Sequence, residues 1–222
     1  MKNFVVSLSD RAEFVIVVLV AFAYPIYVSL LVALLPSNHA VISEAGLHVL
    51  LVHEIIVFTL LWLFLHTRGW RFSDVGLVPS LRDGLLGVGL AVLMYGLYIM
   101  LWMIFSRVLP DLHQHAAKLV APDLNLLTVL AVSMVNPIFE EVFVCGYVIT
   151  ALRKTRSTSF AINVSIAIRL AYHLYQGSIS LINILPMGII YAYWFARTGR
   201  LWPLVIAHGI FDFIAFALYT QH

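Results

Sequence analysis

The stretch "NPIFEEVFVCGYV", residues 136–148, places two adjacent carboxylates, Glu140 and Glu141, inside an otherwise apolar segment. The chain around it has 222 residues, of which 62% are hydrophobic and only 11% are charged, and its mean hydropathy is +0.98. A soluble domain has roughly 25% charged residues. The composition therefore indicates an integral membrane protein, with both carboxylates inside a membrane-embedded segment.

Seven segments are candidate membrane spans, because a span needs about 20 predominantly apolar residues. They predict an all-α fold, a polytopic transmembrane helix bundle of about seven spans, and they leave little chain for a soluble domain. We therefore expect residues 1–222 to form a single membrane domain. The candidate spans are residues 12–35, 46–66, 84–106, 125–152, 158–176, 178–197 and 201–220.

Basic residues are distributed unevenly about these segments. Only Arg107 and Lys118 fall in connections on one side, and Arg169 lies within the fifth segment. The positive-inside rule then predicts a cytoplasmic N-terminus, and we expect a plasma-membrane protein in contact with lipid. The net charge of +2 is too small to indicate a nucleic-acid partner. The basic residues on the predicted cytoplasmic side are Lys2, Arg11, Arg68, Arg71, Arg82, Arg153, Lys154, Arg156, Arg197 and Arg200.

Ionisable groups within the candidate spans are functional candidates. A charge near the bilayer centre costs roughly 2.5–3.5 kcal/mol on insertion scales. Residues four apart share a helix face, so two of these helices each present a polar pair. His53 and Glu54 remain open, either as supporting partners of a site or as polar groups near the end of a span. The candidates are His53, Glu54, Glu140, Glu141, Arg169, His173, His208 and Asp212.

The two adjacent carboxylates are not equivalent. Neighbouring residues lie about 100° apart on a helix, so one is expected to face a reaction centre and the other a supporting partner. At a rise of about 1.5 Å per residue, Glu140, His173 and His208 lie about 18, 24 and 12 Å from the cytoplasmic ends of their spans. A kink at Pro137 and helix tilt would bring them together. A carboxylate and two imidazoles could activate water and stabilise an oxyanion.

These residues resemble three motifs of the CPBP intramembrane proteases, which include type II CAAX prenyl endopeptidases and Abi or bacteriocin-immunity proteins. "EEVFVCG" (140–146) resembles EExxxR, "RLAYH" (169–173) resembles FxxxH, and "HGIFD" (208–212) resembles HxxxN or HxxxD. The resemblance covers roughly residues 125–220, the expected motif-bearing catalytic core. "DVGL" (74–77) is similar to a segment common upstream in the family.

The resemblance implies an intramembrane endopeptidase that hydrolyses a peptide bond near the membrane surface. Glu140 would activate the attacking water with help from His173, while His208 and Asp212 would polarise the substrate carbonyl and hold the oxyanion. Asp212 stands where many relatives have Asn, and an ionised carboxylate donates no hydrogen bond, so it would be protonated or would orient His208. The implied substrate is a peptide or membrane protein: a prenylated C-terminus, a leader peptide or a signalling peptide.

Two positions depart from the family pattern. Cys145 stands where the first motif has Arg, and Arg169 stands where the second has Phe. We hypothesise that the guanidinium has moved to the neighbouring helix and that Arg169 pairs with Glu141, since a charge buried alone is costly. Glu141 is then the supporting carboxylate, and Cys145 is expected to be a small apolar packing residue.

A metal and a second function are the alternatives. Glu140, His173 and His208 have the donor chemistry of a zinc site, and the family is commonly called a metalloprotease. A glutamate-activated water needs no metal, however, and the HExxH signature is absent, so we assign no cofactor and keep a divalent metal such as zinc as the alternative. The alternative function is a non-catalytic membrane immunity or scaffold protein of the same fold, with the buried groups as structural pairs.

Overall fold

The computed structural model describes residues 8–35, 42–109, 119–121, 124–218 and 220. These residues form no strand, and their only β-type pairing is an isolated bridge between Ile42 and Val120. The all-α prediction is therefore confirmed. The helical elements are α2 (Asp10–Leu34), α3 (Glu44–Thr67), α4 (Leu81–Phe105), α6 (Leu126–Glu140), η1 (Glu141–Tyr147), α7 (Val148–Arg153), α8 (Thr158–Tyr172), η2 (Leu174–Leu181), α9 (Ile184–Thr198) and α10 (Trp202–Ala217).

Each of the seven predicted segments is helical, but not each is long enough to cross a membrane alone. Among the described residues, α2, α3, α4 and the run Leu126–Arg153 are long and apolar enough to do so. A fifth crossing is reached if η2 and α9, which meet at a bend of 91°, count as one span. Helices α8 and α10 have only 15 and 16 residues, short of the roughly 20 that a span needs. The structure confirms a membrane helix bundle, with seven helical segments but fewer full-length spans.

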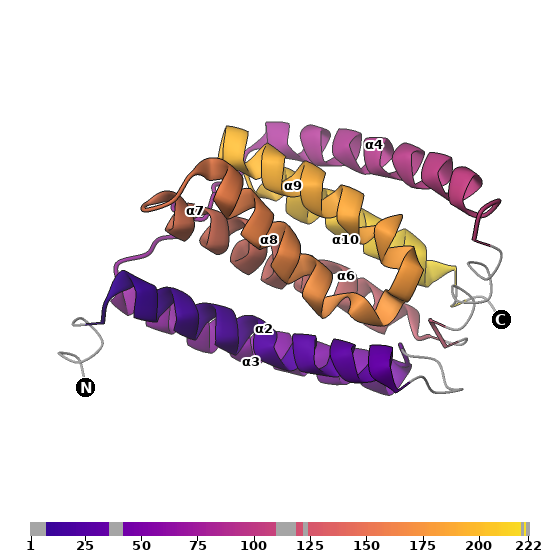
Figure 1. The fold of residues 1–222 in the computed structure, drawn as a ribbon, viewed down its shortest axis with the longest axis horizontal. Helices are drawn as coiled ribbons and strands as arrows, with labels where there is room; N and C mark the ends of the chain where they lie inside the picture. Colours follow the sequence, from indigo (N-terminus) through magenta and orange to yellow (C-terminus); the bar gives the residue numbers. More distant parts are fainter. Residues whose placement is uncertain (1–7, 36–41, 110–118, 122–123, 219, 221–222) are drawn as a thin grey trace.

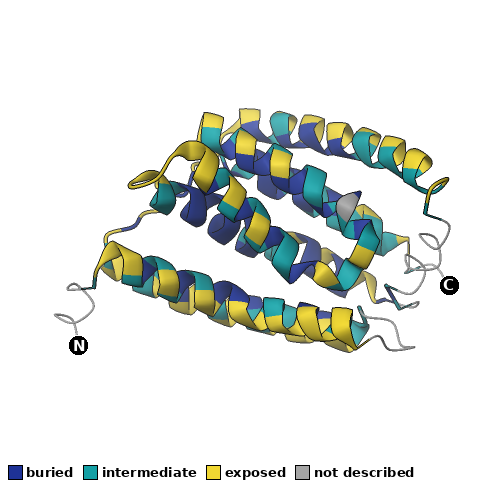
Figure 2. Cartoon of the chain, in the orientation of Figure 1, coloured by how far each residue is buried: buried dark blue, intermediate teal, exposed yellow. Residues whose placement is uncertain are grey.

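The bundle surrounds the segment that carries the two carboxylates. Helices α2 and α3 cover one side and α4 the other, with α6, α8, α9 and α10 between them (Figure 1). In the run Leu126–Arg153, 61% of the apolar window is buried, against 17% to 22% in α2, α3 and α4. Figure 2 shows this contrast, with dark central helices and largely exposed outer faces. The outer helices therefore face lipid, and the central run faces protein.

The central run changes helix type at the carboxylates. Pro137 has no backbone N–H, so the carbonyl of Ser133 cannot receive its usual helical hydrogen bond. Helix α6 ends at Glu140, and the next seven residues form the π-helix η1, every one of them buried. Such wide turns occur frequently at functional sites. A π-helical turn thus begins at Glu141, four residues after Pro137, while the kink at Pro137 stays a prediction.

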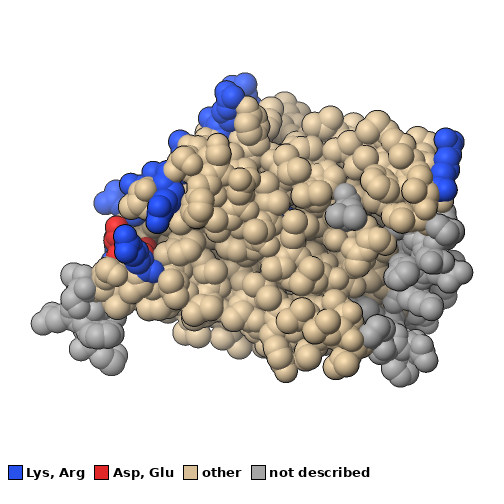
Figure 3. All heavy atoms as spheres, viewed as in Figure 1, with Lys and Arg blue, Asp and Glu red and all other residues tan. Residues whose placement is uncertain are grey.

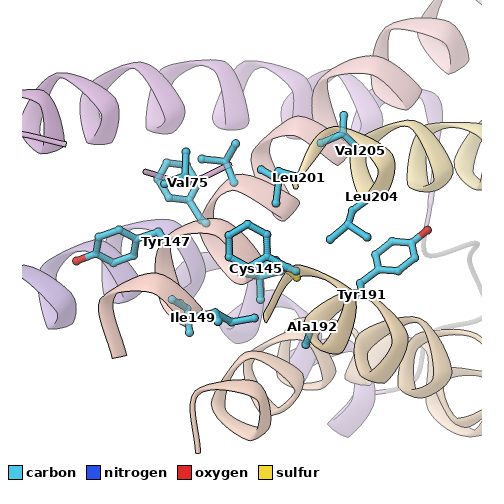
Figure 4. Packing of buried hydrophobic residues seen from close by; sticks show 14 of the residues in the cluster. Val75, Cys145, Tyr147, Ile149, Tyr191, Ala192, Leu201, Leu204 and Val205 are labelled. Atoms are coloured by element: carbon cyan, nitrogen blue, oxygen red, sulfur yellow. The ribbon is translucent and has the colours of Figure 1, made fainter. Parts of the chain in front are cut away.

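The "DVGL" segment packs directly against η1. A side chain on Gly146 would come within 2.9 Å of the carbonyl oxygen of Val75, so only glycine permits this approach. Gly76 has φ of +77°, and its carbonyl accepts a hydrogen bond from the N–H of Leu201 at 3.1 Å. Figure 4 shows Val75 and Leu201 in the same apolar cluster as Cys145. The segment therefore joins η1 to the start of α10.

A buried polar cluster holds the end of the bundle where α2 begins. The Glu13 carboxylate accepts hydrogen bonds from Arg68 Nε at 2.7 Å, Trp70 Nε1 at 2.8 Å and the Tyr147 hydroxyl at 3.1 Å. These bonds connect α2, the connection after α3 and the last residue of η1. Figure 3 shows Lys and Arg side chains gathered at this end, with basic atoms also at the opposite end. Lys2 and Lys118 lie outside the described residues.

Close approach of α6 and α10 depends on Gly209. A Cβ atom at this position would lie 2.6 Å from the carbonyl oxygen of Ser133, the same carbonyl that Pro137 leaves without its helical partner. In membranes, small residues let helix backbones approach closely. Gly209 follows His208, so the contact also sets the depth of a candidate catalytic side chain.

Replacing Gly209 with Ala is expected to destabilise the bundle. Overpacking a tight contact typically costs about 1–3 kcal/mol. The midpoint of thermal unfolding in detergent should fall. The control is Gly89→Ala on α4, where an added Cβ meets no described atom within 4 Å. Equal midpoints for the two variants would contradict this account of the contact.

Candidate active site

The six predicted site residues come from three neighbouring parts of the bundle. Five of them are buried, and Asp212 has 15% of its side chain exposed. Glu140 and Glu141 lie at the junction of α6 and η1, Arg169 and His173 at the end of α8, and His208 and Asp212 on α10. The structure thus brings together residues that lie up to 72 positions apart between Glu140 and Asp212.

Arg169 contacts Glu141, as the sequence predicted. Its Nη2 donates to both carboxylate oxygens of Glu141 at 2.7 Å, and its Nη1 lies 3.4 Å from Oε2 of Glu140. Nη2 is also 3.8 Å from the sulfur of Cys145. The guanidinium therefore lies beside position 145, where the family motif has Arg. Cys145 is buried as expected, but it contacts the charged network as well as apolar neighbours.

Glu141 also holds His208. The Nδ1 atom of His208 is 2.8 Å from Oε1 of Glu141, and because an ionised carboxylate only accepts, Nδ1 carries the proton. The other ring nitrogen, Nε2, lies 3.6 Å from Oδ1 of Asp212. Oδ2 of Asp212 accepts a hydrogen bond from the amide of Asn136 at 3.1 Å. Asp212 thus lies beside His208, while Glu141 makes the hydrogen bond that orients the ring.

Glu140 has one occupied oxygen and one available oxygen. The Tyr172 hydroxyl donates to Oε2 at 2.7 Å, the oxygen that Arg169 also approaches. Within the described part of the chain, no hydrogen bond is made to Oε1. Glu140 can therefore accept a further hydrogen bond, for example from water.

His173 is held in one orientation. Its Nδ1 lies 3.0 Å from the carbonyl oxygen of Arg169, and since a carbonyl only accepts, Nδ1 carries the proton. The ring lies against Tyr172 and Tyr175, with centroid distances of 4.5 and 5.9 Å. In the neutral ring, Nε2 is then a hydrogen-bond acceptor.

A cavity of about 660 Å³ joins these groups. Glu140, His173, His208 and Asp212 all line it, whereas Glu141 and Arg169 do not. The structure therefore separates four residues that face the cavity from an ion pair behind them. The cavity continues to Ile42, Leu119 and Val120, near the first residues of α3 and at the opposite end of the bundle from the Glu13 cluster.

Sequence reasoning missed Asn136 and Tyr172 as members of the site. Asn136 opens the stretch quoted at the start, and Tyr172 precedes His173 within the second motif. Their position close to motif residues was therefore the available sequence signal for both residues. A cross-helix hydrogen bond has no signature in spacing, so the partner of each could not be read from the sequence.

The donor atoms present do not suit a metal ion without rearrangement. Ligand atoms of Glu140, Glu141 and His208 lie within 4.8 Å of one another, and they are the one such group of three in the described residues. His173, a member of the predicted zinc set, is not part of it. Both oxygens of Glu141 already accept from Arg169, whose positive charge lies among the donors. The guanidinium charge would oppose a cation among these donors, so the residues do not fit a metal as they stand.

Comparison with known proteins finds a family model that matches part of the chain. An all-α membrane bundle with a Glu, His and Asp cavity has the features of a membrane-embedded hydrolase. Residues 122–214 match the family model described as type II CAAX prenyl endopeptidase Rce1-like. The matched region contains the three motifs, and the match supports membership of the CPBP family of membrane proteases. No curated protein and no solved structure matches the chain.

An arginine at position 145, where the family motif has it, is expected to compensate for the loss of Arg169. Arg169→Phe leaves Glu141 buried without a guanidinium, and breaking such a pair costs roughly 3–5 kcal/mol. Adding Cys145→Arg should restore most of the lost stability, because the two positions adjoin the same carboxylate. The measurement is denaturant unfolding of the single and double variants in detergent.

The matched control for this rescue is Cys145→Met in the Arg169→Phe background. Met adds length at position 145 without adding charge. If Met restores as much stability as Arg, volume rather than charge explains the rescue and the relocated-arginine hypothesis is wrong.

Proposed function

We propose that this protein is an intramembrane endopeptidase in which Glu140 activates the attacking water. The observation that carries the proposal is the arrangement of the cavity wall: Glu140 has an available oxygen, and His173 and His208 line the same cavity from two other helices. Family membership supports protease chemistry, and the residue roles are our assignment.

The reaction begins with a water between Glu140 and His173. Glu140 takes a proton from the water, and the water oxygen attacks the carbonyl carbon of the substrate. Nε2 of neutral His173 accepts the second water proton as a hydrogen bond and so positions the oxygen for attack. Glu140 then gives its proton to the leaving amine as the carbon–nitrogen bond breaks.

The tetrahedral oxyanion needs hydrogen-bond donors on the opposite side. His208 fills this role as an imidazolium, donating Nδ1–H to Glu141 and Nε2–H to the oxyanion. Asp212 lies beside Nε2 and stabilises the positive charge of the His208 ring. The hydrogen bond from Asn136 keeps the Asp212 carboxylate in place. In this arrangement Asp212 need not be protonated, because it supports the donor rather than donating itself.

Glu141 and Arg169 are positioning residues in this proposal. Neither lines the cavity, and together they hold His208 and one oxygen of Glu140. The ion pair keeps a carboxylate buried at the site without leaving an uncompensated charge.

We propose a peptide or membrane-protein substrate that enters between the helices. The cavity lies within the usual range of ligand pockets, roughly 300–1,000 Å³, and most of its lining is apolar. We place the N-terminus in the cytoplasm, because basic residues gather where α2 begins, and we further propose a plasma-membrane location. On this placement the cavity extends toward the extracytoplasmic face.

Removing the proposed base is expected to abolish cleavage. Glu140→Gln preserves shape and should lower the rate of reporter-peptide hydrolysis by about 10²–10⁴-fold, the usual contribution of a general base. His173→Ala should also lower the rate. The control is Asp10→Asn, a carboxylate with 75% of its side chain exposed. Purified protein in detergent is the assay material; undiminished cleavage by both site variants would reject the enzyme proposal in favour of a scaffold role.

Chelators are expected to leave the activity unchanged. The reason is that Arg169 already occupies both oxygens of Glu141, the central donor of the closest ligand group. The measurement is cleavage of the same reporter after dialysis against 1,10-phenanthroline, with and without added zinc. A loss of activity that zinc restores would show that the reaction uses a metal.

A further inference from the structure

The cavity contains a third carboxylate that the proposed reaction does not use. Glu54 of α3 lines the cavity and is only 2% exposed. Its Oε2 is buried and makes no hydrogen bond within the described part of the chain. Glu54 lies ten residues inside α3. It is therefore not a polar group near the end of a span, which was one of the two interpretations that the sequence left open.

The other two cavity carboxylates have partners. Glu140 has Tyr172 and Arg169, and Asp212 has Asn136 and His208. The described lining residues include no Lys or Arg. Glu54 is therefore the carboxylate that the described cavity leaves without a compensating group.

A buried carboxylate without a partner is costly, in a membrane bundle above all. A ligand that supplies a hydrogen-bond donor or a positive charge would remove that cost when bound. The aromatic side chains of Tyr24, Tyr95 and Tyr98 line the same cavity. Aromatic faces attract cations within about 6 Å, so the cavity that Glu54 lines suits an ammonium or guanidinium group.

The position of Glu54 relative to Glu140 follows from the start of two helices. The Glu44 side chain accepts hydrogen bonds from the backbone of Asn125 and from Thr128, which holds α3 and α6 level at their first residues. At about 1.5 Å per residue, Glu54 lies about 15 Å and Glu140 about 21 Å along their helices. The difference along the helix axes is about 6 Å, close to the length of two extended peptide residues.

We propose that Glu54 is a substrate-specificity residue that binds a Lys or Arg side chain located about two residues from the cleaved bond. This inference rests on the proposed protease function and names its substrate class: an apolar peptide segment with one basic residue near the cleavage position. The same carboxylate disfavours a substrate whose free C-terminal carboxylate enters the cavity. Among the substrates considered, a leader or signalling peptide fits better than a prenylated C-terminus.

The test compares apolar reporter peptides that carry Lys, norleucine or Glu at one position near the cleaved bond. Norleucine has a similar length to Lys and no charge. For the unsubstituted protein, the ratio of kcat/KM for Lys over norleucine should be about 10- to 100-fold, the range expected for a hydrogen bond to a charged group. Glu54→Gln should reduce this ratio to near one, and Glu54→Lys should favour the Glu peptide.

The matched control is Asp83→Asn. Asp83 is also a buried carboxylate, but it pairs with Arg200 and lies outside the cavity. It should leave the Lys to norleucine ratio unchanged. Thermal unfolding of each variant in detergent checks that the protein is folded.

Binding of the same peptides to the Glu140→Gln variant gives a second readout that needs no turnover. Tighter binding of Lys than norleucine, lost with added Glu54→Gln, supports the inference even if no reporter is cleaved. Cleavage without a charge preference, or a preference that Glu54→Gln leaves intact, overturns the role of Glu54 and leaves the protease proposal standing. Absence of cleavage together with a charge preference in binding instead counts against the protease proposal.

Discussion

The buried ion pair between Arg169 and Glu141 is the interaction on which the site depends. Its two hydrogen bonds of 2.7 Å join α8 to η1, and Glu141 continues the connection to His208 on α10. Three helices are thus tied through one carboxylate. Both charges are almost fully buried, so neither can be lost alone without exposing the other to an apolar environment. This chain departs from the family motifs at Cys145 and Arg169. The two departures can be described as one change, in which the guanidinium comes from a different helix and binds the same carboxylate.

Close backbone contacts make that connection possible. Gly209 brings α10 against α6, and Gly146 brings η1 against Val75. Lipid is as apolar as the helix surfaces, so burial of apolar side chains drives helix association only weakly in a membrane. Tight packing at small residues and buried hydrogen bonds then hold the bundle together. The π-helical turn after Glu140 is consistent with this tight packing, because it places seven consecutive residues in the buried centre of the bundle.

The cavity divides polar residues by role. Behind its wall, the ion pair fixes geometry; on its wall, Glu140 has an available oxygen and His173 an orientation set by a backbone carbonyl. Helices shorter than a membrane span are compatible with this arrangement of polar residues. Helices α8 and α10 are below span length, but each buries one face against the bundle and so carries side chains to the centre. Glu54 extends the polar wall toward the part of the cavity lined by Ile42 and Val120, and we propose that it selects among apolar peptides.

The sequence by itself determined the all-α membrane class and the candidate residues, and its departures from the family motifs suggested the pairing of Arg169 with Glu141, which the structure confirms. An apolar composition indicates that the chain lies in a bilayer, and helical spacing indicates which side chains share one face of a helix. Only the tertiary structure decided the other contacts between helices: the Asn136 bond to Asp212, the Tyr172 bond to Glu140 and the shared cavity that includes Glu54. It also decided that two segments are too short to cross alone. Periodicity is a property of one helix, whereas these contacts depend on tilt, depth and register between helices, which residue spacing does not encode.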